Sequence, residues 1–136
     1  ISKEGCGFAY RFSRFQANSN IILSAVLKLK KSNKEEITNN ILLIKKLKFN
    51  QPTGKNAGCF FKNPNNTSAG YLIEHAGMKG KCVNGAQVSN NHADFIVNIG
   101  EAKARDVLKL ANMIKLAVRK KFKEELEEEI RFIGEN

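Results

Sequence analysis

The run from Ala104 to Phe122 constrains the fold of this chain most strongly, because apolar residues recur along it at helical spacing without a proline or glycine. A helix with such a stripe is stable only when another element covers the stripe. The run therefore predicts a long amphipathic helix that forms one side of a hydrophobic core. The stripe consists of Val107, Ala111, Ile114, Val118 and Phe122.

Upstream, the pattern predicts one strand and two further helices. Aliphatic residues between Ile21 and Leu29 favour a buried strand. Ser32 and Glu35 have the spacing of a capping box, and a helix after them presents Ile37, Ile41 and Ile44 on one face before it ends ahead of Pro52. A short helix is expected from Ser68, its cap, to Ala76, where Gly77 closes it.

The remaining segments favour strands. Residues 82–86 are typical of a tight turn between two short strands, and residues 94–98 of another strand. Residues 126–133 alternate in polarity, which predicts a strand with Glu129 and Arg131 on one face. Together the elements predict the α+β class, an antiparallel sheet packed by helices.

Composition restricts the setting of the chain. No run approaches the roughly 18 apolar residues of a membrane span, so we expect no membrane association. The three cysteines are an odd number at wide spacing, which argues against a disulfide framework and a zinc site and favours a reducing, cytoplasmic setting. The chain opens with Ile-Ser-Lys-Glu, and we interpret this start as a cut.

The net charge of +10 attracts anions, which include nucleic acids and phosphorylated metabolites. A small basic nucleic-acid-binding module is therefore one candidate. Single-strand binders need aromatic residues between their basic ones, whereas the aromatics here lie beside glycines and prolines or within apolar runs. A lysine-rich solvated surface without nucleic acid is the favoured interpretation.

Three places could carry chemistry. Tyr10 and Arg11 lie in an aromatic stretch, where a guanidinium either stacks on rings or clamps a carboxylate. Cys59 lies among small residues that let a ligand approach, and its thiol, with an ordinary pKa of about 8.5, is either a buried apolar group or a proton donor. Glu129 and Arg131 form either a surface ion pair or one half of a ligand site.

In their shared order these segments resemble the UDP-N-acetylenolpyruvoylglucosamine reductase family, from about Phe8 to Glu135. The short spacing between Pro64 and Ala69 resembles the shorter branch of that family. The colinear motifs are Phe8-Ala-Tyr-Arg-Phe-Ser-Arg-Phe15, Asn56-Ala-Gly-Cys-Phe-Phe-Lys-Asn-Pro64, Ser68-Ala-Gly-Tyr-Leu-Ile-Glu74, Gly85-Ala-Gln-Val-Ser89, His92-Ala-Asp-Phe-Ile-Val-Asn98 and Leu126-Glu-Glu-Glu-Ile-Arg-Phe-Ile-Gly134.

The resemblance implies a reaction of peptidoglycan precursor synthesis in which NADPH reduces FAD and the flavin reduces the enolpyruvyl double bond of a UDP-sugar. It implies that Arg11 polarises the enolpyruvyl carboxylate, that Cys59 protonates the adjacent carbon where many relatives have serine, and that Glu129 is the catalytic glutamate. The substrate-binding residues that it implies are Tyr10, Lys48, Asn63, Gln87, His92 and Arg131.

The same resemblance implies two parts, a remnant of the FAD-binding domain over residues 1–31 and a substrate-binding domain over residues 32–136. The glycine-rich phosphate loop of a flavin domain is not found, since Gly5-Cys6-Gly7 lacks the strand and helix around it. We expect the chain neither to hold FAD tightly nor to turn over alone. A degraded remnant without activity is the third alternative, and the oligomeric state stays open.

Overall fold

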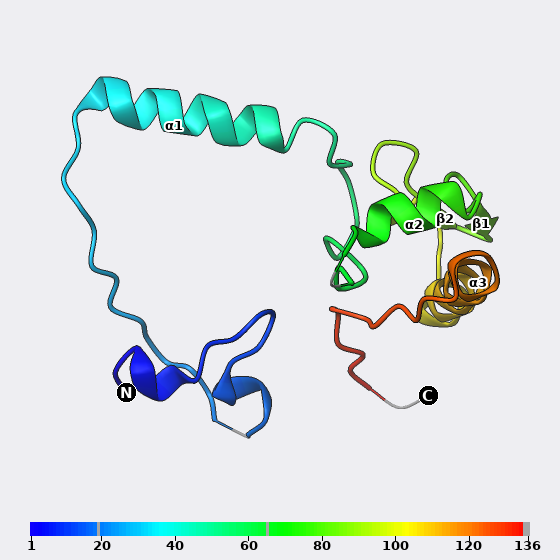
Figure 1. Cartoon of the computed structure of the whole chain (residues 1–136), viewed down its shortest axis with the longest axis horizontal. Coiled ribbons are helices and arrows are strands. Elements are labelled where there is room, and N and C mark those ends of the chain that lie inside the picture. The colour runs from blue at the N-terminus through cyan, green and yellow to red at the C-terminus, as the bar shows by residue number, and fades with distance from the viewer. Residues whose placement is uncertain (19, 65, 135–136) are drawn as a thin grey trace. The chain divides into compact units, whose positions relative to one another are not determined.

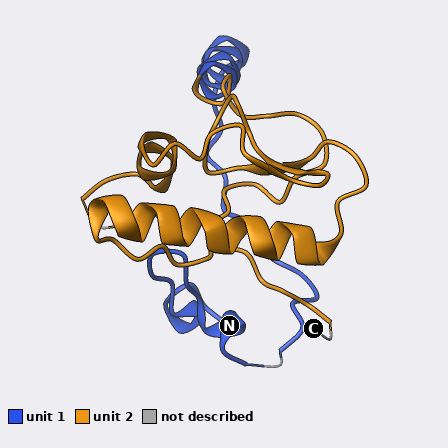
Figure 2. Cartoon of the chain, turned by 90° about the vertical axis from the view of Figure 1, so that its right-hand side faces the viewer, with its two compact units in different colours: residues 1–46 blue, residues 47–136 orange. Residues whose placement is uncertain are grey.

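The computed structural model describes residues 1–18, 20–64 and 66–134, so positions 19, 65, 135 and 136 lie outside the described part. The chain divides into two compact units, Ile1–Lys46 and Leu47–Asn136, which Figure 2 colours separately. The predicted division into residues 1–31 and 32–136 concerns function and stays a prediction.

The first unit contains two short 3-10 helices, η1 (Glu4–Cys6) and η2 (Arg14–Gln16), and all but the last residue of the longer helix α1 (Lys34–Leu47). The predicted helix is confirmed, although its cap differs from the prediction. Asn33, one residue after Ser32, accepts a hydrogen bond from the Glu36 amide at 2.8 Å. The Ser32 hydroxyl instead donates to the Glu36 carboxylate. Asparagine caps as well as serine does, and here it stands nearer the first turn.

The predicted buried strand over residues 21–29 is wrong. The structure assigns neither helix nor strand there, and all of these side chains are exposed, Val26 to 99%. A strand needs a neighbouring main chain to complete its hydrogen bonds. Residues 21–29 take part in none of the strand pairings among the described residues, so their apolar sequence alone does not make them a strand.

The second unit is built on a three-stranded antiparallel sheet in the order β1 (Cys82–Val83), β2 (Ala86–Val88) and β3 (Ile96–Asn98). Val83 pairs with Ala86 across the turn, and Gln87 pairs with Val97. The predicted strand at residues 94–98 is confirmed over its last three positions. The α+β class is confirmed with it.

Two helices cover this sheet, α2 (Ala69–His75) and α3 (Ala104–Phe122), and α3 packs against α2, β1 and β2 (Figure 1). Ser68 caps α2 by accepting a hydrogen bond from the Tyr71 amide at 3.2 Å, and Gly77 follows with a φ of +75°. The predicted cap and the predicted closing glycine are both confirmed.

The core of the second unit lies between α3 and the sheet. The predicted stripe of α3 faces it, with Ala111, Ile114 and Val118 buried and the two end residues partly buried. Leu110, which the stripe did not include, is also fully buried. Other core residues come from the preceding loop, the helix α2, the sheet and the C-terminal segment, namely Phe60, Phe61, Leu72, Ile73, Met78, Val88, Ile96 and Leu126.

The start of α3 is joined to the β1–β2 turn. The Asp106 carboxylate accepts hydrogen bonds from the Lys103 amide at 2.9 Å and from Asn84 Nδ2 at 2.8 Å. Gly85 lies so close that a Cβ on it would be 2.6 Å from the Ala102 amide nitrogen. The turn and the helix therefore hold each other in one arrangement.

The predicted strand over residues 126–133 is wrong in extent. Only one bridge forms, between Phe61 and Glu128, and the chain bends at Glu129. The partner segment is short, because it lies between Gly58, with a φ of +85°, and Pro64. A ladder cannot continue where its partner has turned away.

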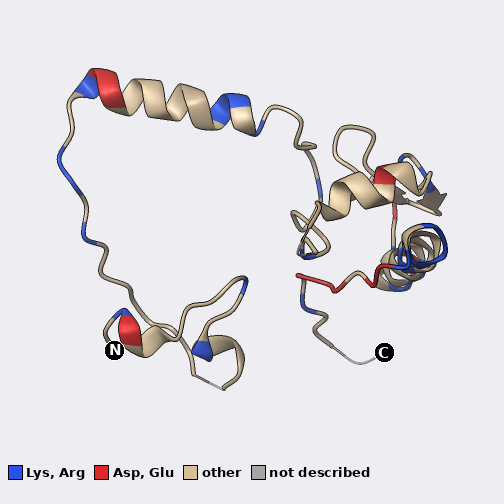
Figure 3. Cartoon of the chain, in the orientation of Figure 1, with Lys and Arg blue, Asp and Glu red and all other residues tan. Residues whose placement is uncertain are grey.

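The acidic segment that follows α3 is paired with basic residues. Glu125 pairs with Arg119 at 3.0 Å, Glu128 pairs with Lys115 at 2.9 Å, and Glu127 pairs with Lys62. Figure 3 shows this run in red. These pairs direct the segment along α3, although exposed ion pairs add little to stability. In the described part of the chain, no helix is both long and apolar enough to cross a membrane.

Candidate active site

The segment around Cys59 is held by the aromatic residues that follow it. Phe60 and Phe61 are both buried in the core with their rings 5.0 Å apart. The Phe60 amide donates to the main-chain oxygen of Asp94 at 2.7 Å, and the Phe61 amide donates to Asp94 Oδ1 at 2.9 Å. Cys59 itself is partly buried, so its thiol lies next to a rigid core and stays within reach of solvent.

Glu129 reaches the same place from the other end of the unit. Its amide donates to the Phe60 carbonyl at 2.9 Å, and the Lys62 amide donates to the Glu127 carbonyl at 2.8 Å. These two bonds fix Glu129 beside the residue that follows Cys59. The structure thus brings together two of the residues that the sequence analysis singled out, although 70 positions separate them in the chain.

Asp94 lies between them. It is only 3% exposed, and its carboxylate interacts with the Cys59 side chain through a hydrogen bond and with the Glu129 charge. Burial raises the pKa of Asp94 from 3.8 to about 7 and the nearby negative charge of Glu129 adds to the rise, while the bonds from Phe61, Cys59 and Phe60 oppose it. A carboxyl that titrates near neutral pH at a candidate site is suited to moving protons.

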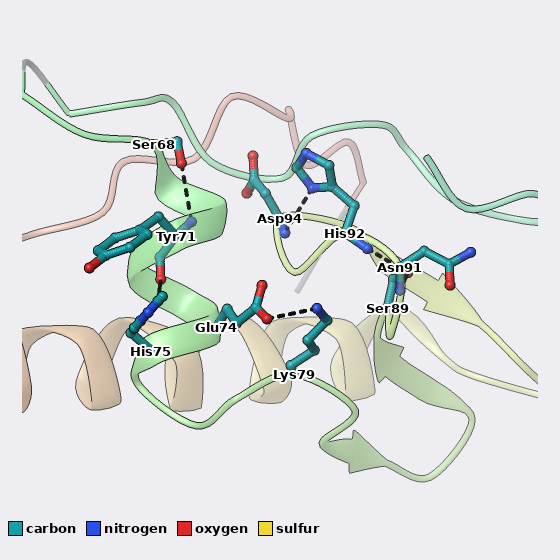
Figure 4. Close-up of polar contacts among 9 residues, drawn as sticks. All are labelled: Ser68, Tyr71, Glu74, His75, Lys79, Ser89, Asn91, His92 and Asp94. Atoms are coloured by element: carbon teal, nitrogen blue, oxygen red, sulfur yellow. Dashed lines mark hydrogen bonds and ion pairs between the residues drawn. The ribbon is translucent and has the colours of Figure 1, made fainter. Parts of the chain in front are cut away.

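His92 precedes Asp94 in the same loop, and Figure 4 shows the two side by side. The Asp94 amide donates to His92 Nδ1 at 3.3 Å, and the imidazole meets the Phe95 ring edge-on at 4.9 Å. Burial lowers the pKa of His92. Helix α2 approaches at Gly70, where a Cβ would lie 3.3 Å from the imidazole. These contacts give His92 a fixed orientation beside Asp94.

The other residues predicted to bind the UDP-sugar have mixed surroundings. Asn63 Oδ1 accepts a hydrogen bond from the Ala69 amide at 3.0 Å and so supports the start of α2. Gln87 Nε2 donates to the Gly80 carbonyl at 3.4 Å. Lys48 and Arg131 are exposed. Their roles as substrate ligands stay predictions.

Tyr10 and Arg11 belong to the first unit, so no distance joins them to Cys59 or Glu129. They form the tip of a turn closed by reciprocal main-chain bonds between Ala9 and Phe12. Arg11 has a φ of +52°, and its guanidinium lies 5.8 Å from the centre of the Tyr10 ring. Stacking on an aromatic ring gives an exposed arginine a preferred direction.

Gly5 and Gly7 do not form the phosphate loop of a flavin domain. Gly5 and Gly7 lie in and after η1, and a Cβ on Gly5 would meet Ile1 Cγ2 at 2.9 Å, so these glycines pack on their own neighbours and form no cradle for phosphates. Nor do the described His, Cys, Asp and Glu side chains gather in threes that could hold a metal.

The C-terminal domain family of UDP-N-acetylenolpyruvoylglucosamine reductase matches residues 49–133. The chain belongs to this family. The matched range contains Cys59, Asp94 and Glu129, and the UDP-N-acetylenolpyruvoylglucosamine reductase resemblance seen in the sequence motifs is thereby confirmed.

Individual members of the reductase family match nearly the whole chain. The enzyme of that name from Fervidobacterium nodosum is 47% identical over 96% of this chain, and the one from Halalkalibacterium halodurans is 39% identical over 99% of it. The solved reductase from Thermus caldophilus superposes with a TM-score of 0.83 over 94% of the chain at 41% identity. The chain spans 43% to 46% of the length of these three proteins.

Proposed function

We propose that this chain supplies the substrate-binding and proton-donating side chains of a reductase that converts UDP-N-acetylenolpyruvoylglucosamine to UDP-N-acetylmuramate for peptidoglycan synthesis. The proposal is supported by the family membership and by one observation above all. Cys59 and Glu129 come from distant segments and both interact with the carboxyl of Asp94. A thiol hydrogen-bonded to one carboxyl group and influenced by the charge of another is suited to proton transfer.

In this proposal Cys59 is the general acid. The enolpyruvyl group gains a hydride at one carbon, which leaves an electron pair on the carbon next to the carboxylate. That pair takes the proton of the Cys59 thiol, so a C–H bond forms, the S–H bond breaks and a thiolate remains. Glu129 is the second catalytic side chain, and the bond from its amide to the Phe60 carbonyl supports this assignment.

Arg11 is assigned to the substrate carboxylate, flanked by Tyr10, and this part of the proposal rests on the resemblance of the first unit. A guanidinium stabilises the charge that develops on a carboxylate during reduction. Lys48, Asn63, Gln87, His92 and Arg131 are assigned to the UDP-sugar. Phosphate oxygens accept hydrogen bonds from cationic and amide groups of this kind.

FAD and NADPH supply the hydride chemistry of the whole enzyme in this proposal. Because Gly5 and Gly7 form no phosphate cradle, we assign the phosphates of both cofactors to a part of the enzyme other than this chain. In this proposal another part of the enzyme delivers hydride, and this chain binds the substrate and delivers a proton.

A chimera tests the proposal. This chain replaces the matching 43% of the Fervidobacterium nodosum reductase, with which it is 47% identical, and NADPH oxidation is followed with UDP-N-acetylenolpyruvoylglucosamine. We expect turnover by the chimera and by Cys59→Ser, which keeps a proton donor. Cys59→Ala should lose roughly a hundredfold or more in kcat. A soluble chimera that binds flavin and substrate but shows equal kcat for Cys59→Ala and Cys59→Ser would refute the role of Cys59.

Calorimetry on the 136-residue chain separates substrate binding from the nucleic-acid alternative. We expect heat on adding UDP-N-acetylglucosamine, and a weaker signal for single-stranded oligonucleotides that disappears at high salt. Binding of oligonucleotides alone, with an affinity that falls steeply as salt rises, would favour the basic nucleic-acid-binding module instead.

A further inference from the structure

Asp94 is a buried acid that the proposed reaction does not yet use. It interrupts the buried run Ala93-Asp94-Phe95-Ile96-Val97, which is otherwise apolar. A buried carboxyl is costly unless it is hydrogen-bonded or neutral, so its retention among core residues calls for a physical reason. Its carboxylate meets the Phe61 amide at 2.9 Å and the Cys59 side chain.

The position of this carboxyl is fixed from both sides. The Phe60 and Phe61 amides bond the main-chain oxygen and Oδ1 of Asp94, and the Asp94 amide bonds His92 Nδ1. With one oxygen committed to Phe61, the carboxyl group cannot rotate freely. The thiol of Cys59 therefore has an acceptor in a constant direction.

We propose that Asp94 is a positioning residue for Cys59, whose carboxylate holds the thiol hydrogen and thereby determines when the thiol releases its proton. Its part in catalysis rests on the proposed function, whereas the link between the two side chains does not. While Asp94 is ionised, its charge opposes a second negative charge on the sulfur and keeps the thiol protonated. Once Asp94 is protonated, that opposition ends.

The charged neighbours of Asp94 come from each element around it. The C-terminal segment brings Glu129, whose charge repels that of Asp94, and the same loop brings His92. On α2, Gly70 lies next to Asp94 and has no side chain. Glu74 on α2 and Lys79, which follows that helix, act electrostatically on His92. A change in the ionisation of Asp94 therefore acts on the candidate site through Cys59, whose side chain is hydrogen-bonded to the Asp94 carboxyl group.

The ionisation of Asp94 adds a proton-transfer step to this link. Burial raises the pKa of Asp94 to about 7, so near neutral pH both protonation states are populated. After Cys59 has given its proton to carbon, a protonated Asp94 can return one. Its O–H bond breaks, the S–H bond forms again, and the carboxylate regains a proton from water.

Alkylation of the chain by iodoacetamide across the pH range, with each cysteine followed by peptide mass spectrometry, tests the link. Asp94→Asn keeps an oxygen acceptor for the Phe61 amide but removes the ionisable group. We expect Cys59 to react roughly severalfold faster in Asp94→Asn just above neutral pH, because the carboxylate charge that opposes a thiolate has been removed. The thiols of Cys6 and Cys82 serve as internal references and should not change.

The reciprocal measurement keeps Asp94 intact and follows its carboxyl carbon by NMR during a pH titration. We expect Cys59→Ala to raise the pKa of Asp94, because a hydrogen bond that favours the carboxylate is lost. Cys59→Ser keeps a donor and should leave the pKa near that of the parent chain. Equal values for the parent and Cys59→Ala would overturn the proposal, as would identical Cys59 alkylation profiles in the parent and a folded Asp94→Asn.

The outcomes of the two sets of experiments are independent. A chimera that fails to reduce the UDP-sugar, together with a Cys59 profile that responds to Asp94, would reject the proposed function and keep the link. A turning-over chimera whose Cys59 ignores Asp94 would do the reverse.

Discussion

The Phe61 amide donates a hydrogen bond to Asp94 Oδ1 at 2.9 Å across 33 positions of sequence. Both residues are buried, so neither group can exchange this partner for water. The bond links the loop that carries Cys59 to the loop before β3. The stability of the second unit and the geometry of its candidate site therefore depend on the same carboxyl group.

Removing that acceptor should destabilise the chain. Asp94→Ala leaves the Phe61 amide buried without a partner, which costs about 1 to 3 kcal/mol in the free energy of unfolding. Asp94→Asn still offers an oxygen and should lose less. Urea unfolding followed by circular dichroism measures both, and a smaller loss for Asp94→Ala than for Asp94→Asn would contradict the assignment.

The raised pKa of Asp94 makes stability depend on pH. Between about 3.8 and about 7 the folded chain keeps a proton that the unfolded chain has released. The contribution of Asp94 is thus complete below pH 3.8 and is lost as pH rises to 7, by up to roughly 1.4 kcal/mol per pH unit. His92, whose pKa is lowered, acts in the opposite direction.

A comparison of the parent chain with Asp94→Asn isolates the contribution of Asp94 to the pH dependence of stability, because His92 is present in both. The difference in unfolding free energy, parent minus variant, should fall steadily from acidic to neutral pH and then level off. A difference that is constant across this range would mean that Asp94 ionises in the folded chain as it does in the unfolded one.

Leu110 provides a test of the core, since its side chain is 0% exposed on α3. Leu110→Ala should cost about 2 to 5 kcal/mol through lost burial and the cavity left behind. Leu116 on the same helix is 66% exposed, so Leu116→Ala should change stability by about 0.5 kcal/mol or less. Both variants lose the same atoms, so thermal melts of the two compare a buried leucine with an exposed one. Equal losses of stability would contradict the orientation of α3.

Gly85 should tolerate no side chain, because a Cβ there would lie 2.6 Å from the Ala102 amide nitrogen and 2.9 Å from that of Glu101. Main-chain atoms cannot move away cheaply, so Gly85→Ala should destabilise by about 1 to 3 kcal/mol. Gly100 is the matched control, with its nearest neighbour at 3.9 Å. Gly100→Ala should unfold close to the parent in the same denaturant series.

Asn63 separates a structural role from a binding role. Asn63→Ala removes the acceptor of the Ala69 amide and should cost about 1 kcal/mol, whereas Asn63→Asp keeps an acceptor and should fold normally. If Asn63 also binds phosphate oxygens, the added negative charge of Asn63→Asp should weaken UDP-N-acetylglucosamine binding at least several-fold by calorimetry. Unchanged affinity in both variants would remove Asn63 from the proposed site.

Prediction from the sequence succeeded where a local pattern determines the structure. The bounds of α3 follow from its apolar stripe, and the cap of α2 follows from Ser68 and Gly77. It failed where the structure depends on a partner far along the chain. Residues 21–29 have the composition of a strand but no pairing among the described residues, and residues 126–133 meet a partner that turns away at Pro64.

The candidate site shows the same limit. Cys59 and Glu129 were singled out from the sequence, but their closeness depends on the bond between the Glu129 amide and the Phe60 carbonyl. Asp94 was missed, because its function depends on residues 33 or more positions away. The signal that could have found it is a single acid inside an apolar run, where an unpaired charge would be too costly to keep.

The bonds from Glu127 and Glu129 to the Phe60–Lys62 segment have a consequence for biosynthesis. The ribosome synthesises the helices and the three strands of the described chain before it adds the residues that pair with this segment. Until then the Lys62 amide and the Phe60 carbonyl have only water as partners, and Leu126 has not yet filled its place in the core. The thiol and its neighbouring acids therefore come together only after residues 127–129 have been made, later than every helix and strand described here.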